Sequence, residues 1–469
     1  MYLDRSDMAF RENEKCCLDE DNIVVYRPGN RMYPETRGYK DGEVIKARVI
    51  DKVGDDSKGL PPVFSDEVKL IKIQTVEILD LDSLENKEHV LSKLKTNYPK
   101  RDDFSLLTQI NMQALNTSNL IDNSSEIREL FNSGIMKFAQ LPENNTKNID
   151  ELLNADNFSL TFINHDYAGI TPKMWNYIAS EYSLDIKNSM VIIKRENLAE
   201  ILKVLKLNNK YIGGGFGVGF KDTGWDLLNR EEGYFVNPIA DEMQSTNFVA
   251  HFGDEIHGYN SDATGYSESL TDKFKEIGED ITDKTILLLG AGGTARGIAL
   301  ELVNRGIKKL IILNRTVSKA SDIADKLNVI KPGICEVGDE NSVSSIDYKL
   351  DAIINLSTKG ADGDFEKLSG LAPASLGEEG NIFMTNNLLD KFSSLNSKLI
   401  VSDINLTKTG TTPLLDIASE KNLETLDGKF MVVYQGTEAI WTVFGDKIIA
   451  KGGTKEDVKK KLLKFILNK

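Results

Sequence analysis

One stretch, residues 285–315 (TILLLGAGGTARGIALELVNRGIKKLIILNR), limits the folds open to this chain more than any other. An apolar run at 286–289 leads into a glycine-rich turn, a helical pattern follows, and a second apolar run at 310–313 ends at Asn314. A strand, a glycine turn, a helix and a strand in this order are the setting in which such a turn binds a dinucleotide. We therefore predict an α/β fold with a Rossmann-type domain here.

The glycine turn supplies the residues that we expect to hold the cofactor's phosphates: Gly290, Gly292, Gly293, Thr294 and Ala295. The first glycine permits a tight turn, the second lets the backbone approach a pyrophosphate, and the alanine allows the helix to pack closely on the strand. The phosphates would then meet the positive end of a helix. The alternative interpretation is that these residues form a turn without a ligand.

The end of the second strand indicates which dinucleotide binds. A site for NAD usually carries an acidic residue about 20 residues after the turn, whereas a nearby arginine accommodates the 2′-phosphate of NADP. This chain has Asn314, Arg315 and Thr316 there, with Lys319 one turn further along the next predicted helix. Two cations without a carboxylate favour NADP, and the alternative for Arg315 is a solvated surface charge.

Length and charge limit the remaining classes of protein. The chain has 469 residues, enough for two or three domains, and its net charge of −15 argues against a dominant nucleic-acid-binding surface. Residues 1–22 are charged and lack the apolar core of a signal peptide, and no apolar run approaches the roughly 18 residues of a membrane-spanning helix. Cys16, Cys17 and Cys335 have no metal-ligand spacing, so we expect no metal and a reduced, cytoplasmic protein.

A small β-rich domain is predicted at residues 23–115, after a flexible tail at 1–22. Residues 42–53 and 68–79 alternate apolar and polar side chains as half-buried strands do, and a helical pattern at 83–98 precedes a further strand at 104–111. This pattern resembles the small β-barrels of the PUA and ASCH type. The resemblance implies a nucleotide or RNA contact, and the alternative is a module for docking or oligomerisation. The basic residues concerned are Arg27, Arg31, Arg37, Lys46 and Arg48.

Residues 116–156 are predicted to be a helical connector, with one helix at 124–138. From residue 158 onward the chain alternates short strands and helices, which indicates parallel strands joined by crossover helices. Strands are predicted at 160–163, 190–193, 351–356, 399–404 and 430–434, and helices at 172–182, 198–205, 439–444 and 455–467.

Seven short motifs surround the dinucleotide segment. They are GFKD at 219–222, STNFV at 245–249, HGYNSDATG at 257–265, DAIIN at 351–355, TPLL at 412–415, DGKFM at 427–431 and YQGTE at 434–438. In this order they resemble the shikimate dehydrogenase family over about residues 157–447. The resemblance implies an α/β substrate domain of that family's type at 157–275 with 437–469, and an NADP-binding Rossmann domain at 280–436.

The resemblance also implies residue roles in hydride transfer between NADP and a ring carbon that bears a hydroxyl or ketone. Lys221 and Asp262 match the family's catalytic pair, with Lys221 as acid and base and Asp262 as its positioning partner. Such a proton donor must lie within hydrogen-bond reach of the developing alkoxide. Asn247 and Gln435 match amides that contact the substrate. The alternative roles are a solvated charge for Lys221, an N-cap for Asp262 and backbone contacts for the two amides.

Two substrate-binding turns of the family are altered in this chain. The Ser-x-Ser-Pro turn that holds the substrate carboxylate reads GITP at 169–172, so Thr171 alone keeps a hydroxyl. The Asn-x-Thr-x-Pro-x-Lys strand end reads GFGVGFK at 215–221, where glycines replace three side chains and Lys221 remains. Loss of such groups weakens recognition of a polyhydroxy acid. We expect the glycines to widen the pocket and expose backbone N–H groups, and the substrate to be a larger or differently charged cyclic carboxylic acid.

Two other functions stay open at this point. One is an NADP-binding regulatory protein with a degenerate dehydrogenase domain, which contacts RNA or another protein through its N-terminal domain. The other is a reductase of an imine or an amino-substituted ring, for which the same lysine and aspartate could serve. No membrane partner is expected, and a homo-oligomer is compatible with the sequence.

Overall fold

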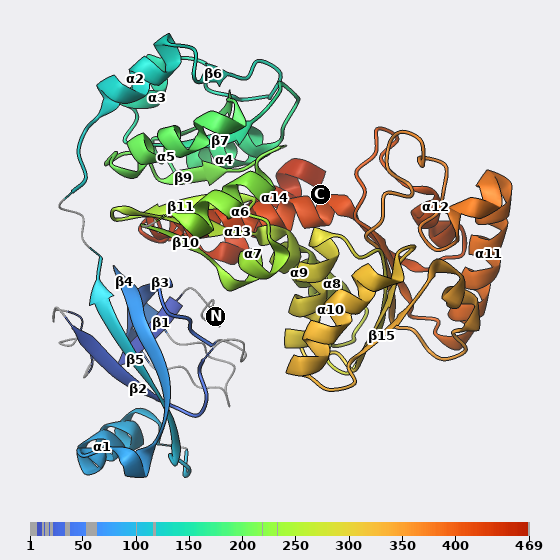
Figure 1. Cartoon of the computed structure of the whole chain (residues 1–469), viewed down its shortest axis with the longest axis horizontal. Helices are drawn as coiled ribbons and strands as arrows, with labels where there is room; N and C mark the ends of the chain where they lie inside the picture. The colour runs from blue at the N-terminus through green and yellow to red at the C-terminus, as the bar shows by residue number, and fades with distance from the viewer. Residues whose placement is uncertain are drawn as a thin grey trace. The chain divides into compact units, whose positions relative to one another are not determined.

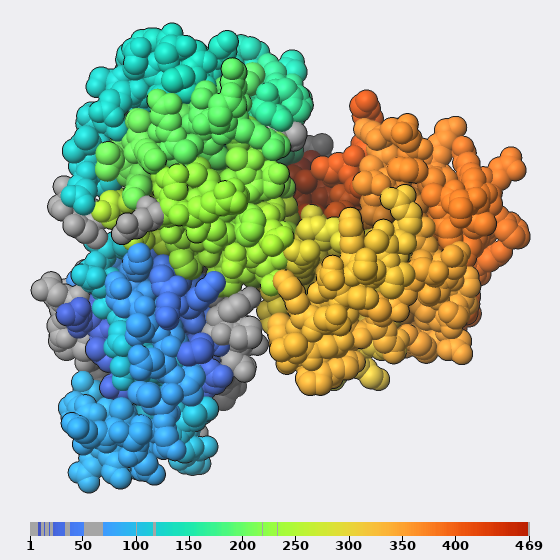
Figure 2. Space-filling model, in the orientation of Figure 1, coloured from blue at the N-terminus to red at the C-terminus, as the bar shows by residue number. Residues whose placement is uncertain are grey.

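The computed structural model describes residues 7–11, 14, 18, 22–32, 38–52, 63–99, 101–115, 119–217, 219–231 and 233–467. The chain divides into two compact units. The first comprises Met1–Pro238, Phe248–Tyr259 and Trp441–Thr454, and the second comprises Ile239–Asn247, Asn260–Ile440 and Lys455–Lys469. Figure 1 shows the ribbon and Figure 2 the surface, both coloured from blue at the N-terminus to red at the C-terminus.

The first unit begins with a five-stranded sheet, blue to cyan in Figure 1. Its elements are β1 (Asp7–Arg11), β2 (Ile23–Pro28), β3 (Val44–Lys52), β4 (Val63–Asp80), η3 (Leu81–Ser83), α1 (Lys87–Asn97) and β5 (Leu106–Ala114). The strand order is β1-β3-β4-β5-β2, with β1 parallel to β3 and the other pairs antiparallel. Alternate residues such as Ile45, Ala47, Ile71 and Ile73 enter one core, because successive side chains of a strand point to opposite faces.

The predicted β-rich N-terminal domain is confirmed, whereas the predicted flexible tail at 1–22 is wrong in part. Residues 7–11 form β1, and its Met8 and Phe10 are buried with exposed fractions of 1% and 0%. Because charged residues flank this short strand, the sequence shows no strand pattern there. It forms because β3 offers a partner, and that partner is distant along the chain.

Two basic residues of the N-terminal domain fix it to another part of the first unit. Nζ of Lys46 donates a hydrogen bond of 3.1 Å to the carbonyl of Thr442, and Nη2 of Arg48 binds Oδ1 of Asp446 at 3.0 Å. Both acceptors belong to α13 (Gly428–Ile449). Since Lys46 and Arg48 are 5% and 4% exposed, they do not form a surface for nucleic acid, and their contacts favour the docking interpretation.

Arg27, another of these basic residues, gives no such surface either. Arg27 is buried and donates to Oε1 of Glu14 and to the carbonyl of Ala9, each at 3.0 Å. Arg31 is partly exposed. Arg37 lies outside the described residues. The resemblance to PUA and ASCH barrels stays a prediction.

The remainder of the first unit carries two smaller sheets, of orders β6-β8-β7 and β10-β12-β11-β9. Its elements are α2 (Ser124–Asn132), β6 (Lys137–Phe138), α3 (Ile149–Asn154), β7 (Asn157–Ile163), α4 (Thr171–Glu181), β8 (Ile186–Ile192), η4 (Arg195–Asn197), α5 (Leu198–Lys206), β9 (Gly213–Gly215), α6 (Lys221–Arg230), β10 (Tyr234–Val236), β11 (Phe248–Phe252) and β12 (Glu255–Tyr259). Strand β6 pairs with β8, so the predicted helical connector at 116–156 also contributes to a sheet. Parallel bridges from Phe158 to Tyr211 and from Phe162 to Phe216 join the two sheets.

The second unit is built on six parallel strands in the order β15-β14-β13-β16-β17-β18. Its elements are α7 (Pro238–Met243), which begins at the unit boundary, α8 (Ser261–Glu276), β13 (Thr285–Leu289), α9 (Gly293–Asn304), β14 (Lys309–Leu313), α10 (Val317–Ile330), β15 (Cys335–Gly338), η5 (Glu340–Ser345), β16 (Ala352–Asn355), η6 (Ala374–Leu376), α11 (Gly377–Leu395), β17 (Ile400–Asp403), α12 (Pro413–Glu420), β18 (Glu424–Asp427), most of α13 and α14 (Lys455–Leu467). The strand order reverses between β13 and β16, which is the switch point where doubly wound sheets bind nucleotides. The Rossmann prediction is confirmed.

Helices cover both faces of this sheet, as the two cores show. Ile286 and Leu288 of β13 join a core with α8, α9 and α10, whereas Leu287 and Leu289 join another with α11 and α12. The uninterrupted apolar sequence of β13 is therefore required, since both faces of a parallel sheet are buried.

Two further predictions differ from the structure. Residues 430–434, expected as a strand, lie in α13, and the strand at this position is β18 just before it. Helix α8 belongs to the second unit, whereas the predicted boundaries place residues up to 275 in the substrate domain. The final predicted helix, 455–467, is confirmed as α14.

Among the described helices, none combines the length and the apolar character that crossing a membrane requires.

Candidate functional site

The glycine turn begins where β13 ends, and its first residue must be glycine. Gly290 has φ = +118°, a conformation that other residues rarely adopt. Its N–H donates to the carbonyl of Leu313 at 2.8 Å, and a Cβ would lie 3.0 Å from the carbonyl of Leu356. The turn therefore passes close to the backbone of both neighbouring strands.

The next part of the turn is open to a ligand. A Cβ on Gly292 would meet nothing within 4 Å, and Gly292 and Gly293 are exposed while Ala295 is buried. Gly292 is the N-cap of α9, which starts at Gly293 and continues through Thr294. The first N–H groups of a helix have no partner within the helix and carry the positive end of its dipole. This arrangement fits the pyrophosphate of a dinucleotide.

The predicted 2′-phosphate residues lie in the turn after β14 and in the first turn of α10. Asn314 follows β14, and its Nδ2 donates to the carbonyl of Thr316 at 2.8 Å. Arg315 and Lys319 are exposed, and neither pairs with a carboxylate among the described residues. Two cations without an anionic partner beside this turn fit a phosphate group.

Two glycines that the sequence analysis missed bring helices of the second unit together. A Cβ on Gly297 of α9 would lie 2.9 Å from the Cβ of Ala263, and one on Gly265 of α8 would lie 2.5 Å from the backbone N of Gln435. Both positions accept only glycine because the approaching atoms belong to packed helices. Both glycines are visible in the sequence, Gly265 as the last residue of the motif at 257–265 and Gly297 as the fourth glycine after β13. Their spacing does not indicate which distant residue each one contacts.

Asp262 is held in place by two asparagines. Nδ2 of Asn247 donates to Oδ1 of Asp262 at 2.9 Å, and Oδ1 of Asn247 accepts from the N–H of Ser261 at 3.0 Å. Asn260 caps α8, since its Oδ1 accepts from the N–H of Asp262 at 3.0 Å. Asp262, 6% exposed, is thus not the N-cap, and its carboxylate projects from the first turn of α8.

Gln435 lies on α13 where that helix contacts α8 through Gly265. Its Oε1 is shielded from solvent and has no hydrogen-bond partner among the described residues. A buried amide oxygen without a partner carries an energetic cost. A ligand hydroxyl is one group that would remove this cost.

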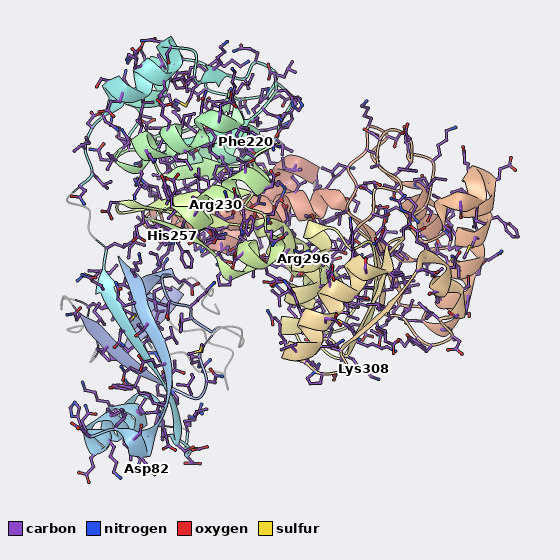
Figure 3. The ribbon with its side chains drawn as sticks, viewed as in Figure 1. Asp82, Phe220, Arg230, His257, Arg296 and Lys308 are labelled. Carbon is purple, nitrogen blue, oxygen red and sulfur yellow. The ribbon has the colours of Figure 1, made fainter. Side chains whose placement is uncertain are left out.

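Lys221 and Thr171 belong to the first unit. Lys221 is the first residue of α6 and is exposed, and it follows the buried Phe220, which is labelled in Figure 3. Thr171 is the first residue of α4 and is partly exposed. Both side chains stand at helix N-termini, where N–H groups are available to an anionic ligand.

The space beside the glycines before Lys221 is occupied, which corrects the expectation that they widen the pocket. A Cβ on Gly217 would lie 2.6 Å from Cγ2 of Ile163 and 3.0 Å from the hydroxyl of Tyr167. A Cβ on Gly219 would lie 2.3 Å from Nδ2 of Asn164. These positions require glycine because side chains from β7 and the loop after it pack against them. The polar groups that lie against these glycines are those of Tyr167 and Asn164 and, at Gly215, the hydroxyl of Thr161.

A buried carboxylate fixes the loop that follows β16. Asp403, at the end of β17, accepts hydrogen bonds of 2.9 Å from Nδ2 of Asn355 and from Oγ1 of Thr412. Asn355 also donates to the carbonyl of Lys359 at 2.8 Å. Burial raises the pKa of Asp403 to about 6, although these hydrogen bonds lower it. The network holds residues 357–359 beside the glycine turn, where Ser357 N would be 3.0 Å from a Cβ on Gly290.

Comparison with known proteins agrees with this geometry. The family model described as shikimate / quinate 5-dehydrogenase matches residues 272–353. A shikimate dehydrogenase (NADP(+)) of Bartonella quintana is 28% identical over 276 residues, which are 59% of this chain and 83% of that protein. One of Geobacillus sp. is 34% identical over 214 residues, which are 45% of this chain and 68% of that protein.

A solved structure shares the fold. Shikimate 5-dehydrogenase of Listeria monocytogenes, in complex with shikimate and NAD, aligns with a TM-score of 0.52 and 22% identity, covering 66% of this chain and 96% of that one. The two-domain α/β architecture predicted from the motifs is thus confirmed.

Proposed function

Because this chain belongs to the shikimate dehydrogenase family, we propose that it transfers hydride between NADP and a cyclic carboxylic acid whose ring bears a hydroxyl or ketone. It is an NADP-dependent oxidoreductase that acts on a CH–OH group. The observation that carries the proposal is the buried carboxylate of Asp262, to which Asn247 donates a hydrogen bond. Asp262 lies on α8, and α8 packs directly on α9, the helix that follows the glycine turn.

The cofactor supplies or accepts the hydride, and side chains of the protein handle the proton. Lys221 donates a proton to the substrate oxygen during ketone reduction and takes it back during alcohol oxidation. Asp262 orients Lys221 and contacts the same oxygen. Asn247 keeps the Asp262 carboxylate in one orientation, and this is supported by its hydrogen bonds to Ser261 and Asp262 in the first turn of α8.

Two more residues are proposed to contact the substrate. Gln435 accepts a hydrogen bond from a ring hydroxyl, which is supported by the unpartnered Oε1. Thr171 binds the substrate carboxylate with its hydroxyl, and its place at the start of α4 supports this role.

The substrate differs from shikimate in the groups that its ring presents. The family's hydroxyl-bearing turns are altered here, and Tyr167 and Asn164 lie against the glycines that replaced them. A phenol placed where the family has a threonine side chain, and an amide placed where it has a proline, would favour a different pattern of ring substituents. A wider pocket does not explain the difference, because Ile163, Asn164 and Tyr167 fill the space beside Gly217 and Gly219.

The Lys221→Ala variant tests the mechanism. We expect it to lower turnover by about 10²–10⁴-fold while NADPH still binds in calorimetry. Lys203→Ala, which removes an exposed lysine of α5, should leave turnover unchanged. Turnover that survives Lys221→Ala would refute the assigned role of the lysine.

The substrate proposal has its own test. Purified protein is assayed with NADP and shikimate beside a biosynthetic shikimate dehydrogenase, and then with ring acids of other substitution. We expect a much lower kcat/KM for shikimate than the biosynthetic enzyme shows. Equal efficiency with shikimate would refute the altered specificity without affecting the cofactor assignment.

Location and assembly are proposed only in outline. We place the enzyme in the cytoplasm, which the free thiol of Cys335 supports because thiols persist in a reducing compartment. A homo-oligomer stays a prediction, as does any nucleotide or RNA contact of the N-terminal domain.

A further inference from the structure

Helix α13 is interrupted near its end. Phe444, at φ = −138° and ψ = 23°, lies outside the helical region and divides α13 into a longer segment before it and a short one after it. Phe444 is buried, and its ring packs edge-to-face on that of Trp175 in α4, with 5.6 Å between the ring centroids. A Cβ on Gly445 would lie 2.9 Å from the indole of Trp441. Side-chain packing therefore fixes the position of the break, as kinks in helices generally require a specific cause.

The N-terminal domain presents one face of β3 to this break. Val44, Lys46 and Arg48 occupy alternate positions of the strand, so their side chains share a face, while the residues between them enter the core of their own sheet. Val44 packs in one apolar cluster with Val443, the residue just before the break. The two cations beside Val44 are buried, and each has an acceptor on α13.

Lys46 caps the segment before the break. Carbonyls in the last turn of a helical segment lack N–H partners within the helix, and a cation there also meets the negative end of the helix dipole. Nζ of Lys46 donates to the carbonyl of Thr442 at 3.1 Å and lies 3.5 Å from that of Trp441. A buried ammonium without acceptors would be costly, so the lysine and the carbonyls satisfy each other.

Arg48 holds the segment after the break. Asp446 lies in the first turn of that segment, where a carboxylate meets the positive end of the helix dipole. Its Oδ1 is 3.0 Å from Nη2 of Arg48 and 3.4 Å from Nζ of Lys46. One face of β3 thus contacts the carbonyl end of one segment and the acidic start of the next.

We propose that the N-terminal domain acts as an intramolecular clamp, in which Lys46 and Arg48 keep α13 divided at Phe444. Lys46 is then a positioning residue for Gln435, because Gln435 lies on the segment that it caps. Side-chain direction in a helix follows the backbone, so fraying or rotation of this segment moves the Gln435 amide. This second step rests on the proposed function, which assigns a substrate contact to Gln435. The clamp gives the N-terminal domain a task that requires no partner molecule.

Hydrogen–deuterium exchange on the full chain tests the clamp without any substrate. Lys46→Met leaves the carbonyls of Trp441 and Thr442 without this donor. We therefore expect the backbone amides of residues 436–443 to exchange at least about tenfold faster than in the wild-type protein, as at a fraying helix end. Lys46→Arg keeps the charge and the N–H donors, and should stay within about threefold of the wild-type rate. Unchanged exchange in Lys46→Met would overturn the clamp.

Lys69→Met is the matched control. Lys69 belongs to the same sheet and also donates to a backbone carbonyl, that of Leu18 at 2.8 Å. It is paired with Ala47, so its side chain lies on the face opposite to that of Lys46. Exchange in α13 should stay at the wild-type rate in Lys69→Met. Equal acceleration in both lysine variants would mean general loosening of the domain and would overturn the clamp.

Asp446→Asn tests the second segment at less risk to folding, because this side chain is 35% exposed. The variant weakens the pair with Arg48, and the amides of residues 445–449 should exchange severalfold faster. Wild-type exchange at these amides would overturn the hold of Arg48 on the second segment, whatever Lys46→Met shows.

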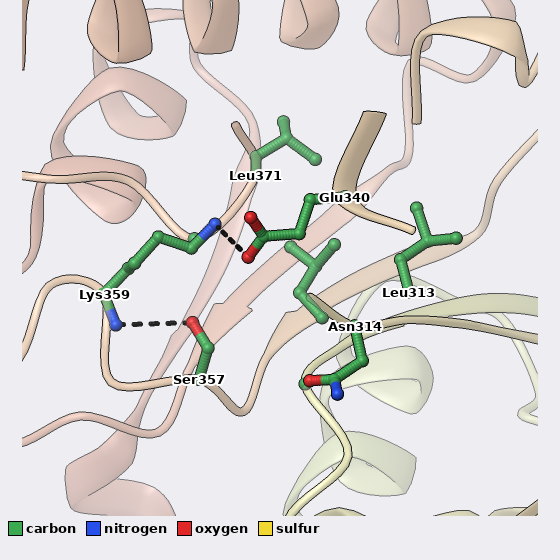
Figure 4. A pocket seen from close by; sticks show the side chains of 9 residues that line it. Leu313, Asn314, Glu340, Ser357, Lys359 and Leu371 are labelled. Carbon is green, nitrogen blue, oxygen red and sulfur yellow. Dashed lines mark hydrogen bonds and ion pairs between the residues drawn. The ribbon is translucent and has the colours of Figure 1, made fainter. Parts of the chain in front are cut away.

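Steady-state kinetics test the link to Gln435. With NADP and shikimate, and with any ring acid that the wild-type protein prefers, Lys46→Met should raise KM for the ring acid by about tenfold, and Lys46→Arg should restore it. NADPH affinity in calorimetry should stay within about twofold. The described residues that line the cavity beside the glycine turn (Figure 4) include none from β3 or α13.

The two readouts separate the possible failures. Faster exchange in Lys46→Met with an unchanged KM would overturn the link to Gln435 and leave the clamp in place. A wild-type protein that turned over no ring acid would refute the proposed function and the role of Gln435 together, whereas the exchange rates would still decide whether β3 holds α13.

Discussion

The amide of Asn247 donates a hydrogen bond of 2.9 Å to the carboxylate of Asp262. The same side chain accepts from the N–H of Ser261, so it contacts two consecutive residues in the first turn of α8. This geometry fixes the direction of the Asp262 carboxylate, and Asn247, which fixes it, lies fifteen positions earlier in the chain.

Asn247→Ala is therefore expected to lower kcat/KM by about 10–100-fold, the effect of losing a hydrogen bond to a charged group. NADPH affinity should stay within about twofold, because Asn247 does not belong to the turn that binds the phosphates. Steady-state kinetics and calorimetry measure the two quantities. Asn386→Ala, which removes an amide contact within α11, is the control, and equal losses in both variants would contradict the positioning role.

Replacing the two cations after β14 should change the cofactor preference. Arg315→Ala and Lys319→Ala are each expected to weaken NADPH binding by about tenfold or more, because each removes a charge-assisted contact to the 2′-phosphate. NADH binding should hardly change. Lys308→Ala, at an exposed lysine labelled in Figure 3, is the matched control. A parallel loss of NADH and NADPH binding would mean that the cations do not read the 2′-phosphate.

Replacement by alanine should affect mainly stability at one glycine, Gly265, and mainly cofactor binding at another, Gly292. At Gly265 the added Cβ would lie 2.5 Å from the backbone N of Gln435, so overpacking should lower the free energy of unfolding by about 1–3 kcal/mol. At Gly292 the Cβ would meet nothing within 4 Å, so stability should fall by less than about 1 kcal/mol, while NADPH affinity drops because the pyrophosphate can no longer approach. Urea unfolding and calorimetry together distinguish the two effects.

The contact between the N-terminal sheet and β12 should weaken in acid. Burial would raise the pKa of Glu255, but hydrogen bonds from His257 and Lys72 outweigh it and lower that pKa from 4.5 to about 2. A carboxyl whose pKa is lowered by folding adds stability above its unfolded pKa and loses it as pH falls through the folded value. Stability should therefore decline between about pH 4.5 and 2.

Lys72 links this titration to the N-terminal domain, since its ammonium pairs with Glu255. In Lys72→Met the decline in unfolding free energy on acidification should be smaller than in the wild-type protein, as measured by urea unfolding at pH 6 and pH 3. Lys87→Met, at an exposed lysine of α1, should titrate like the wild type. An identical pH dependence in Lys72→Met and the wild type would show that the pair does not contribute.

Some errors of prediction have a common origin in distant contacts. Residues 430–434 (FMVVY) have the composition of a strand, yet they form α13, whose next residue, Gln435, lies against Gly265 of α8. Residues 7–11 have no strand pattern, yet they pair with β3. In both cases a partner elsewhere in the chain overrides the local preference.

The glycines before Lys221 show the same limit at the site itself. The sequence shows that three side chains of the family are absent, and by itself this absence predicts a wider pocket. The structure places Ile163, Asn164 and Tyr167 against those glycines, which no spacing in the sequence reveals. The sequence thus predicts the residues around the substrate less completely than the residues around the cofactor.

The sequence by itself determined the cofactor half of this protein, because a glycine turn between a buried strand and a helix is set by local backbone conformation and by the apolar pattern next to it. Gly290, Gly292 and Arg315 could be named for that reason. Only the tertiary structure decided what surrounds them: Asn247 on Asp262, Gly265 on Gln435, and Glu340 with Lys359 beside the turn. These pairs are separated in sequence and meet through packing, so their chemistry is absent from any single stretch of the chain.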